Sequence, residues 1–413
     1  MRPVESGRIG HGVPILLTCV FVVMVGFGIT MPVLPFYTER LVPAQGAPRL
    51  SIAMHVSLLT STYALMQLLF APVWGRWSDK VGRRRLALIG IAGSALTQVL
   101  FGIANSLWLL HAARVLGGAL SSAVFPAASA YVADVTTAEE RSRGMAWLGT
   151  TANLGVVAGL ALGGSLSRHD LHFRFRYGHL MVDSFSVPFF AAAMLMLLTL
   201  IVAFFWLPES VCVTDSARRS GQMAPSWRVL AEKLKLLLTL VVAGQLGLAV
   251  FEATFALYAQ RKLAYGPVEV GIAFSVCALV MAVFQIIATG MLSRYVRQSG
   301  QIVGGFALMG ASLMLLLLPR SMVLVLAIIG LFALGMAFIT PNLSASISTW
   351  GDPYTGAALG MQNAANSLGQ VSGPLLGAAL LNWNPGAPYL FAGVLLLCTA
   401  VLAAAKFSML PTR

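Results

Sequence analysis

The sequence predicts an all-α membrane protein whose twelve membrane-spanning helices form two six-helix bundles. Of the 413 residues, 58% are hydrophobic and only 10% are charged, whereas about a quarter of the residues in a soluble protein are charged. Twelve mainly apolar stretches approach the length of about 20 residues that a helix needs to cross a bilayer. A long polar segment separates the first six from the last six. We therefore expect an N-terminal bundle at 1–207, a cytoplasmic linker at 208–235 and a C-terminal bundle at 236–413.

The positions of the twelve spans follow from the apolar stretches. In the first half they are expected at 13–37, 52–74, 86–105, 107–133, 144–167 and 186–207. In the second half they are expected at 236–260, 268–291, 301–319, 322–349, 356–381 and 388–407. This layout places most of the 27 Lys and Arg residues on one side of the membrane. Because basic residues collect in cytoplasmic loops, we expect a multi-pass protein of the inner (plasma) membrane with both termini in the cytoplasm.

Composition and motifs also exclude several functions. The net charge of +13 comes from basic residues in short loops, without the long basic run or aromatic platform typical of nucleic-acid binding. Neither a Gly-Lys pair nor a His-Glu-x-x-His motif occurs, so we expect no ATP-binding P-loop and no zinc hydrolase. The four cysteines are far apart and lack the spacing of metal ligands. We expect no enzyme activity, no cofactor, no metal and no nucleic-acid partner.

Residues 75–85 form a charged stretch between two apolar ones, with the sequence Gly-Arg-Trp-Ser-Asp-Lys-Val-Gly-Arg-Arg-Arg. Charged side chains are costly in hydrocarbon, so we predict a turn that joins two spans on the cytoplasmic side. The pattern Gly-x3-Asp-[Lys/Arg]-x-Gly-Arg-[Lys/Arg] closely resembles the signature loop between helices 2 and 3 of the major facilitator superfamily. That resemblance implies the major facilitator fold.

Repeated features in the two halves support the same resemblance. The fifth span has glycines at every fourth position over 155–163, and the eleventh repeats this spacing over 369–377. Glycines at this spacing permit close helix packing. Residues 26–37 of span 1 resemble the Gly…Pro-x-x-Pro signature of the twelve-span drug:proton antiporters. The sequence departs from that family in span 5, where Leu160 stands in place of a proline. The resemblance implies two parallel six-span repeats with the transport site between them near the midplane.

The resemblance also implies a latch that closes the cytoplasmic face. Its residues would be Gly75, Asp79, Gly82, Arg83 and Asp134. In the family, the Asp of the signature loop faces the N-terminal end of helix 11, where unpaired N–H groups favour an anion. The alternative is a solvated group of charges that only sets the topology.

Arg114 lies inside the fourth span, at the position of an arginine that is a signature of the family. An arginine at membrane depth costs at least about 2.5 kcal/mol, so it is expected to face a polar cavity. In relatives this arginine is associated with proton coupling. The alternative is that Arg114 extends its side chain to the outer interface of the membrane.

Glu252 is the one acidic residue deep in an apolar stretch, within the seventh span. A carboxyl group in such a place can take up and release a proton as its surroundings open and close. Gln245 and Phe255 lie near it on the same helix, so the span could present an acid, an amide and an aromatic ring to a cationic ligand. The alternative is that Glu252 pairs with Arg261 or Lys262 at the outer end.

The substrate cavity is expected to be lined mainly by spans 1, 4, 7 and 10. Its candidate residues, besides Glu252 and Arg114, are Thr30, Tyr37, Ser121, Ser122, Phe125, Gln245, Phe255 and Asn342. The outer loop at 168–185 alternates aromatic and arginine residues over 173–177, a period typical of a strand, and Gly178 can turn the chain. This loop could be a lid, a contact for anionic lipid or a weak metal site.

We therefore expect a proton-coupled secondary transporter that exports amphipathic small molecules or drugs by alternating access. Its partners would be the substrate, protons and membrane lipids, and the protein would be a monomer driven by the proton gradient. Two alternatives remain open. One is an exporter dedicated to a single metabolite, siderophore or lysolipid, and the other is a membrane sensor built on a transporter fold.

Overall fold

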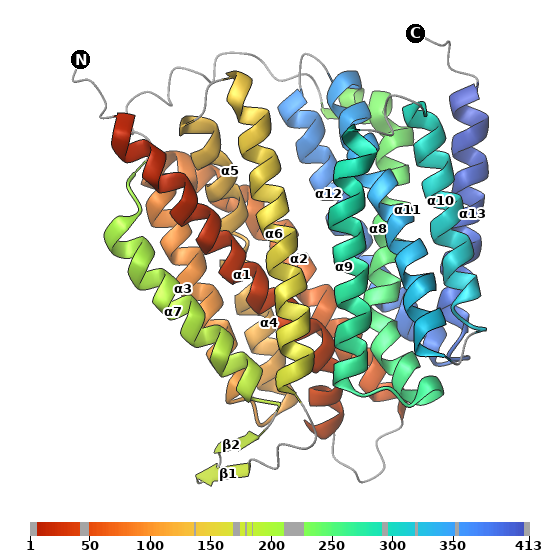
Figure 1. The fold of residues 1–413 in the computed structure, drawn as a ribbon, viewed down its shortest axis with the longest axis horizontal. Coiled ribbons are helices and arrows are strands. Elements are labelled where there is room, and N and C mark those ends of the chain that lie inside the picture. Colours follow the sequence, from red (N-terminus) through yellow and green to blue (C-terminus); the bar gives the residue numbers. More distant parts are fainter. Residues whose placement is uncertain are drawn as a thin grey trace. The chain divides into compact units, whose positions relative to one another are not determined.

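Helices make up nearly all of the computed structural model (Figure 1). The structure describes residues 6–41, 49–135, 138–167, 174–177, 180–183, 185–209, 227–290, 296–318, 321–351 and 355–408. The prediction of an all-α fold is confirmed, with one addition: a hairpin of the strands β1 (Arg174–Tyr177) and β2 (Leu180–Asp183). These strands pair antiparallel, with Arg174 opposite Asp183. The strand predicted from the alternating pattern in this loop is therefore present.

The helices follow the predicted spans closely. The first half contains α1 (Ser6–Leu41), α2 (Arg49–Val81), α3 (Arg83–Gly102), α4 (Leu107–Ser121), α5 (Val124–Val135), α6 (Ala138–Leu166) and α7 (Val187–Trp206). The second half contains α8 (Trp227–Leu263), α9 (Pro267–Gly290), α10 (Gln298–Leu315), α11 (Met322–Trp350), α12 (Thr355–Leu381) and α13 (Ala387–Ser408). Each predicted span coincides with one helix, except the fourth, which contains both α4 and α5.

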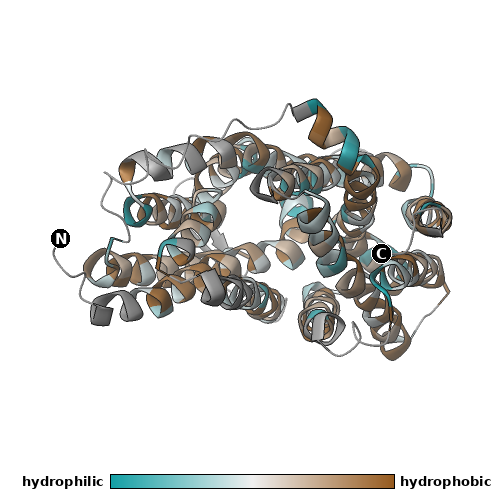
Figure 2. Cartoon of the chain, turned by 90° about the horizontal axis from the view of Figure 1, so that it is seen from above, coloured by the Kyte–Doolittle hydropathy of each residue, from teal (hydrophilic) through white to brown (hydrophobic). Residues whose placement is uncertain are grey.

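Hydrophobic residues predominate along the helices, as the view from above shows (Figure 2). Within the described residues, nine helical stretches are long and apolar enough to cross a membrane. Helices α6, α10 and α12 are not among the nine. The fold class is thus confirmed, while the number of twelve spans stays a prediction.

The chain divides into two compact units. Unit 1 consists of Met1–Gly46, Thr62–Gln222 and Pro267–Ile272, and unit 2 consists of Ala47–Ser61, Met223–Gly266 and Ala273–Arg413. Helix α2 is shared between the units, because its first residues belong to unit 2. The domain boundaries at 207 and 235 stay predictions, and α8 already begins at Trp227.

Close helix packing through glycine organises each unit in the same way. In unit 1, α1 lies against α6, and a Cβ atom added at Gly159 would clash with the carbonyl oxygen of Val25 (Figure 1). In unit 2, α8 lies against α12, and a Cβ atom added at Gly373 would lie 2.7 Å from the Cβ atom of Ala249. The close packing predicted from the two glycine repeats is confirmed, since larger side chains would push these helices apart.

The charged stretch at 75–85 differs from its prediction. Helix α2 continues to Val81 and α3 begins at Arg83, so Gly82 alone separates the two helices. Gly82 has a φ of +99°, a conformation that glycine adopts without steric cost. The prediction of an eleven-residue turn was therefore wrong. Charged residues are compatible with a helix here, because a helix that extends from the membrane into water keeps its backbone hydrogen bonds while water surrounds its charged side chains.

The fourth predicted span is broken between α4 and α5 at Ser122 and Ala123. Pro126 lies in the first turn of α5, where the missing N–H of proline costs no hydrogen bond. At the end of α4, the carbonyl oxygen of Ala119 accepts hydrogen bonds from Trp74 Nε1 at 2.6 Å and Ser122 Oγ at 2.8 Å. These two donors stabilise the break, because they satisfy a carbonyl at a helix end.

Candidate functional site

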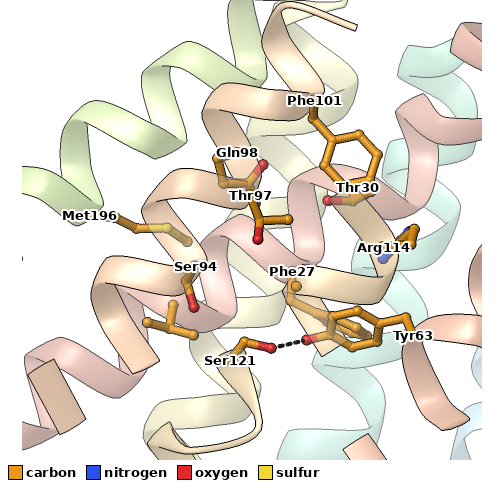
Figure 3. A pocket seen from close by; sticks show the side chains of 12 residues that line it. Phe27, Thr30, Tyr63, Ser94, Thr97, Gln98, Phe101, Arg114, Ser121 and Met196 are labelled. Atoms are coloured by element: carbon orange, nitrogen blue, oxygen red, sulfur yellow. Dashed lines mark hydrogen bonds between the residues drawn. The ribbon is translucent and has the colours of Figure 1, made fainter. Parts of the chain in front are cut away.

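Unit 1 contains a pocket lined by polar and aromatic side chains (Figure 3). The lining residues come from α1, α2, α3, α4 and α7: Val23, Phe27, Thr30, Tyr63, Ser94, Thr97, Gln98, Phe101, Arg114, Gly117, Ser121 and Met196. The pocket volume is about 30 Å³, whereas a pocket for a drug-sized ligand has roughly 300–1,000 Å³. In this conformation the pocket admits one small functional group or one or two water molecules, but not a whole drug molecule.

Arg114 is the only charged residue in the lining of this pocket, and the residue is 4% exposed. Its guanidinium carbon lies 5.3 Å from the ring centre of Tyr63 and 5.3 Å from that of Phe101. Both distances are in the range of cation–π attraction. Arg114 Nε is buried without a hydrogen-bond partner among the described residues. The arginine is therefore held by two aromatic rings inside a polar pocket.

Hydrogen bonds fix the polar groups around the arginine. The hydroxyl groups of Tyr63 and Ser121 lie 2.9 Å apart, and Gln67 Nε2 donates to the Tyr63 hydroxyl at 3.3 Å. Gln98 Nε2 donates to the carbonyl oxygen of Gly26 at 2.8 Å. Side chains fixed by such contacts keep the shape of a pocket when it is empty.

The cavity residues predicted in unit 1 fall into two groups. Thr30 and Ser121 line the pocket together with Arg114. Tyr37, Ser122 and Phe125 are not among its lining residues. The buried hydroxyl of Tyr37 donates at 2.8 Å to the carbonyl oxygens of Phe101 and Ala104, that of Ser122 donates to Ala119, and Phe125 is 43% exposed. Their roles as substrate contacts stay predictions.

The pocket also contains residues that the sequence analysis missed. Ser94, Thr97 and Gln98 come from α3 and Tyr63 from α2, although the cavity was expected to be lined mainly by spans 1, 4, 7 and 10. The spacing of Ser94, Thr97 and Gln98 places them on one face of a helix. A polar face inside an apolar span was the signal that could have identified them.

The candidates in unit 2 lie on α8 and α11. Phe255 is fully buried in an aromatic cluster, with ring centres 5.0 Å from Phe251 and 5.6 Å from Phe274. Gln245 is buried on α8. Asn342 Nδ2 donates to Gln301 Oε1 at 2.9 Å and to the carbonyl oxygen of Phe338 at 2.8 Å. Asn342 thus joins α11 to α10, while its contact with substrate stays a prediction.

Glu252 lies within α8, which runs without a break from Trp227 to Leu263. In a continuous helix, Arg261 is displaced roughly 14 Å along the axis from Glu252 and lies on the opposite side. The alternative in which Glu252 pairs with Arg261 is therefore geometrically unfavourable. Glu252 itself is half-buried.

The residues predicted for the latch are partly described. Arg83 Nε lies 3.0 Å from Asp134 Oδ2, so α3 and α5 are joined by an ion pair. Gly82 forms the turn before α3. Gly75 and Asp79 lie in α2, but the side chain of Asp79 is outside the described part of the structure. The ion pair is present, and its action as a conformational latch stays a prediction.

Glu209 has a role at the same place that the sequence did not reveal. Glu209 Oε1 accepts hydrogen bonds from the backbone N–H groups of Arg83 at 2.7 Å and Arg84 at 3.1 Å. These N–H groups belong to the first turn of α3 and have no partner within the helix. A carboxylate just beyond α7 therefore caps α3 and fixes the end of one helix to the start of the other.

Comparison with known proteins assigns the family. A sequence model of the Major Facilitator Superfamily matches residues 16–339 and 237–413. The chain belongs to this superfamily. It is 26% identical over 395 residues to multidrug resistance protein 2 of Bacillus subtilis (strain 168). This alignment covers 93% of this chain and 92% of that protein. It is 29% identical over 360 residues to tetracycline resistance protein, class D, of Salmonella ordonez, which covers 86% of each.

Solved structures of major facilitator proteins have the same fold. A bacterial homologue of the human lysosomal transporter Spinster, in an inward-facing and occupied conformation, superposes with a TM-score of 0.74 at 13% identity and covers 97% of this chain and 96% of that one. The match to the superfamily model confirms the resemblance that residues 75–85 indicated. The chain is a multi-pass membrane protein of a family that transports small molecules rather than transforming them.

Proposed function

We propose that this major facilitator protein exports amphipathic small molecules, including drugs, from the cytoplasm. The observation that carries the proposal is the pocket around Arg114, a buried cation among polar and aromatic side chains within unit 1. Buried ionisable residues in membrane spans are costly and are retained for function. The similarity along nearly the whole chain to a multidrug resistance protein and a tetracycline resistance protein supports drugs as substrates.

The energy for export comes from protons in this proposal. Glu252 is the proton carrier, because an acid in an apolar span exchanges a proton when water reaches it. Arg114 is the second charged residue inside a membrane span. It favours proton release when the cavity opens to the other side of the membrane. No cofactor takes part.

Transport proceeds by alternating access in this proposal. The paired glycine contacts of α1 with α6 and of α8 with α12 support it, since they give each half a rigid packing that moves as one body. The Arg83–Asp134 ion pair belongs to the latch. A latch that opens in every cycle suits an interaction of about 1–3 kcal/mol.

The protein acts as a monomer in the plasma membrane, with both termini in the cytoplasm. Helices with large exposed apolar side chains, such as Phe205 and Trp206 at the end of α7, contact the lipid. Besides the drug, its partners are therefore protons and membrane lipids.

The function is tested with purified protein in liposomes whose lumen is more acidic than the bath. Ethidium is a suitable probe, because its permanent charge prevents passive accumulation in an acidic lumen. We expect uptake that needs the pH gradient and stops when an ionophore removes it. Equal dye in vesicles with and without protein would contradict export.

Two alternatives are distinguished by the same vesicles. An exporter dedicated to one metabolite, siderophore or lysolipid would leave ethidium and other unrelated drugs outside the vesicles. A sensor on a transporter fold would bind compounds without moving any of them. Uptake of several unrelated amphipathic compounds would exclude both.

A further inference from the structure

The charge of Arg114 lacks a counter-ion in the pocket. Neither an ion pair nor a hydrogen bond joins its guanidinium to any described residue, and its Nε atom is buried without a partner. The other lining residues are neutral. Removing a charge from water is costly unless an opposite charge or hydrogen bonds compensate for it. The positive charge of Arg114 is therefore uncompensated in the pocket, which favours the binding of an anion.

The aromatic neighbours leave the hydrogen-bonding edge of the arginine open. The rings of Tyr63 and Phe101 both lie 5.3 Å from the guanidinium carbon, and Figure 3 shows the guanidinium between them. Ring faces attract the cation but accept no strong hydrogen bond from it. The planar N–H groups of arginine match the two oxygens of a carboxylate.

The size of the pocket limits what it can receive. Its volume of about 30 Å³ admits a group of a few atoms. A carboxylate is of this size, whereas the aromatic body of a drug is not. Phe27 stands in the same lining and provides an apolar contact for the ring that would carry the carboxylate.

We propose that this pocket is a subsite for a carboxylate group of the transported molecule, with Arg114 as its counter-ion. The inference rests on the proposed export function and adds a preferred class to its substrates: aromatic amphipathic compounds that bear a carboxylate. Such compounds bind more tightly than their esters, which lack the negative charge of the carboxylate. Arg114 is the residue that discriminates between acid and ester.

A matched pair of dyes tests this assignment. Rhodamine B carries a free carboxylate, and its ethyl ester has the same ring system without that charge. Binding to the full-length protein in detergent is measured by fluorescence anisotropy at neutral pH. We expect the wild-type protein to bind the acid roughly tenfold more tightly than the ester, as a hydrogen bond to a charged group predicts. Arg114→Gln should bind both dyes equally.

Two further variants make the result specific. Arg114→Lys keeps the charge but loses the planar fork, so it should retain part of the preference. Arg297→Gln removes the same charge from an exposed arginine at the start of α10 and should retain all of it. A wild-type protein without a preference for the acid, or an Arg114→Gln protein that keeps it, would overturn the assignment. Uptake of the ester by wild-type vesicles would still support export, so the two proposals fail separately.

Discussion

The carboxylate of Glu209 accepts a 2.7 Å hydrogen bond from the backbone N–H of Arg83, the first residue of α3. The same oxygen accepts a second bond from Arg84. Capping groups are usually supplied by a residue next to the helix, but this one lies beyond the end of α7. The start of α3 and the end of α7 are therefore coupled at the place where Arg83 also meets Asp134.

Removing this cap should weaken the first unit. We expect Glu209→Ala to lower the free energy of unfolding by about 1 kcal/mol, the usual cost of losing a helix cap. Thermal unfolding in detergent measures the change. Glu232→Ala removes a carboxylate whose partner is the exposed Lys235 and should leave the melting temperature unchanged. Equal melting temperatures for Glu209→Ala and wild type would show that the cap contributes no stability.

The contact between α1 and α6 provides a second prediction. Gly159→Ala places a methyl group against the carbonyl of Val25, and such overpacking typically costs about 1–3 kcal/mol. Gly149 lies on the same helix with open space around it, so Gly149→Ala should be neutral or slightly stabilising. Yield and melting temperature of the two variants should differ clearly. Similar behaviour of both would mean that the helices are not packed closely here.

The Arg83–Asp134 ion pair is tested by a double-mutant cycle. Both side chains are largely shielded, at 10% and 24% exposure, so we expect a coupling energy of about 1 kcal/mol between Arg83→Gln and Asp134→Asn. The exposed pair Lys235–Glu232 is a suitable reference, with an expected coupling near zero. If the two substitutions change the free energy of unfolding additively, Arg83 and Asp134 are not coupled, and their ion pair is not part of the latch.

The part of the fold that is encoded locally could be predicted from the sequence. The length of the apolar stretches is a local property, and it predicted the helices. The glycine spacing at 155–163 is also local, and it predicted the close packing seen between α1 and α6. The end of α2 was missed, because charged residues exclude hydrocarbon but do not distinguish a turn from a helix that extends into water. Gly82 was the only local sign of where that helix ends.

The site was less predictable, because its residues meet only in the folded chain. Arg114 was found, since a charge in an apolar span is conspicuous. Thr97 was missed, because hydroxyl groups in spans often bond to their own helix, as Thr97 does to the carbonyl of Gly93. The partnership of Glu209 with Arg83 joins residues far apart in the sequence, and no local pattern encodes it.

Proton exchange through Glu252 is the central claim, and it is tested by following the pH of the lumen. Proteoliposomes with an acidic lumen receive ethidium from outside, and a trapped pH-sensitive dye reports whether protons leave as the drug enters. We expect the lumen to become more alkaline with the wild-type protein. With Glu252→Gln the lumen should keep its pH, because the amide of glutamine neither takes up nor releases a proton at these pH values. Full proton release by Glu252→Gln, at the wild-type rate of ethidium uptake, would contradict the account.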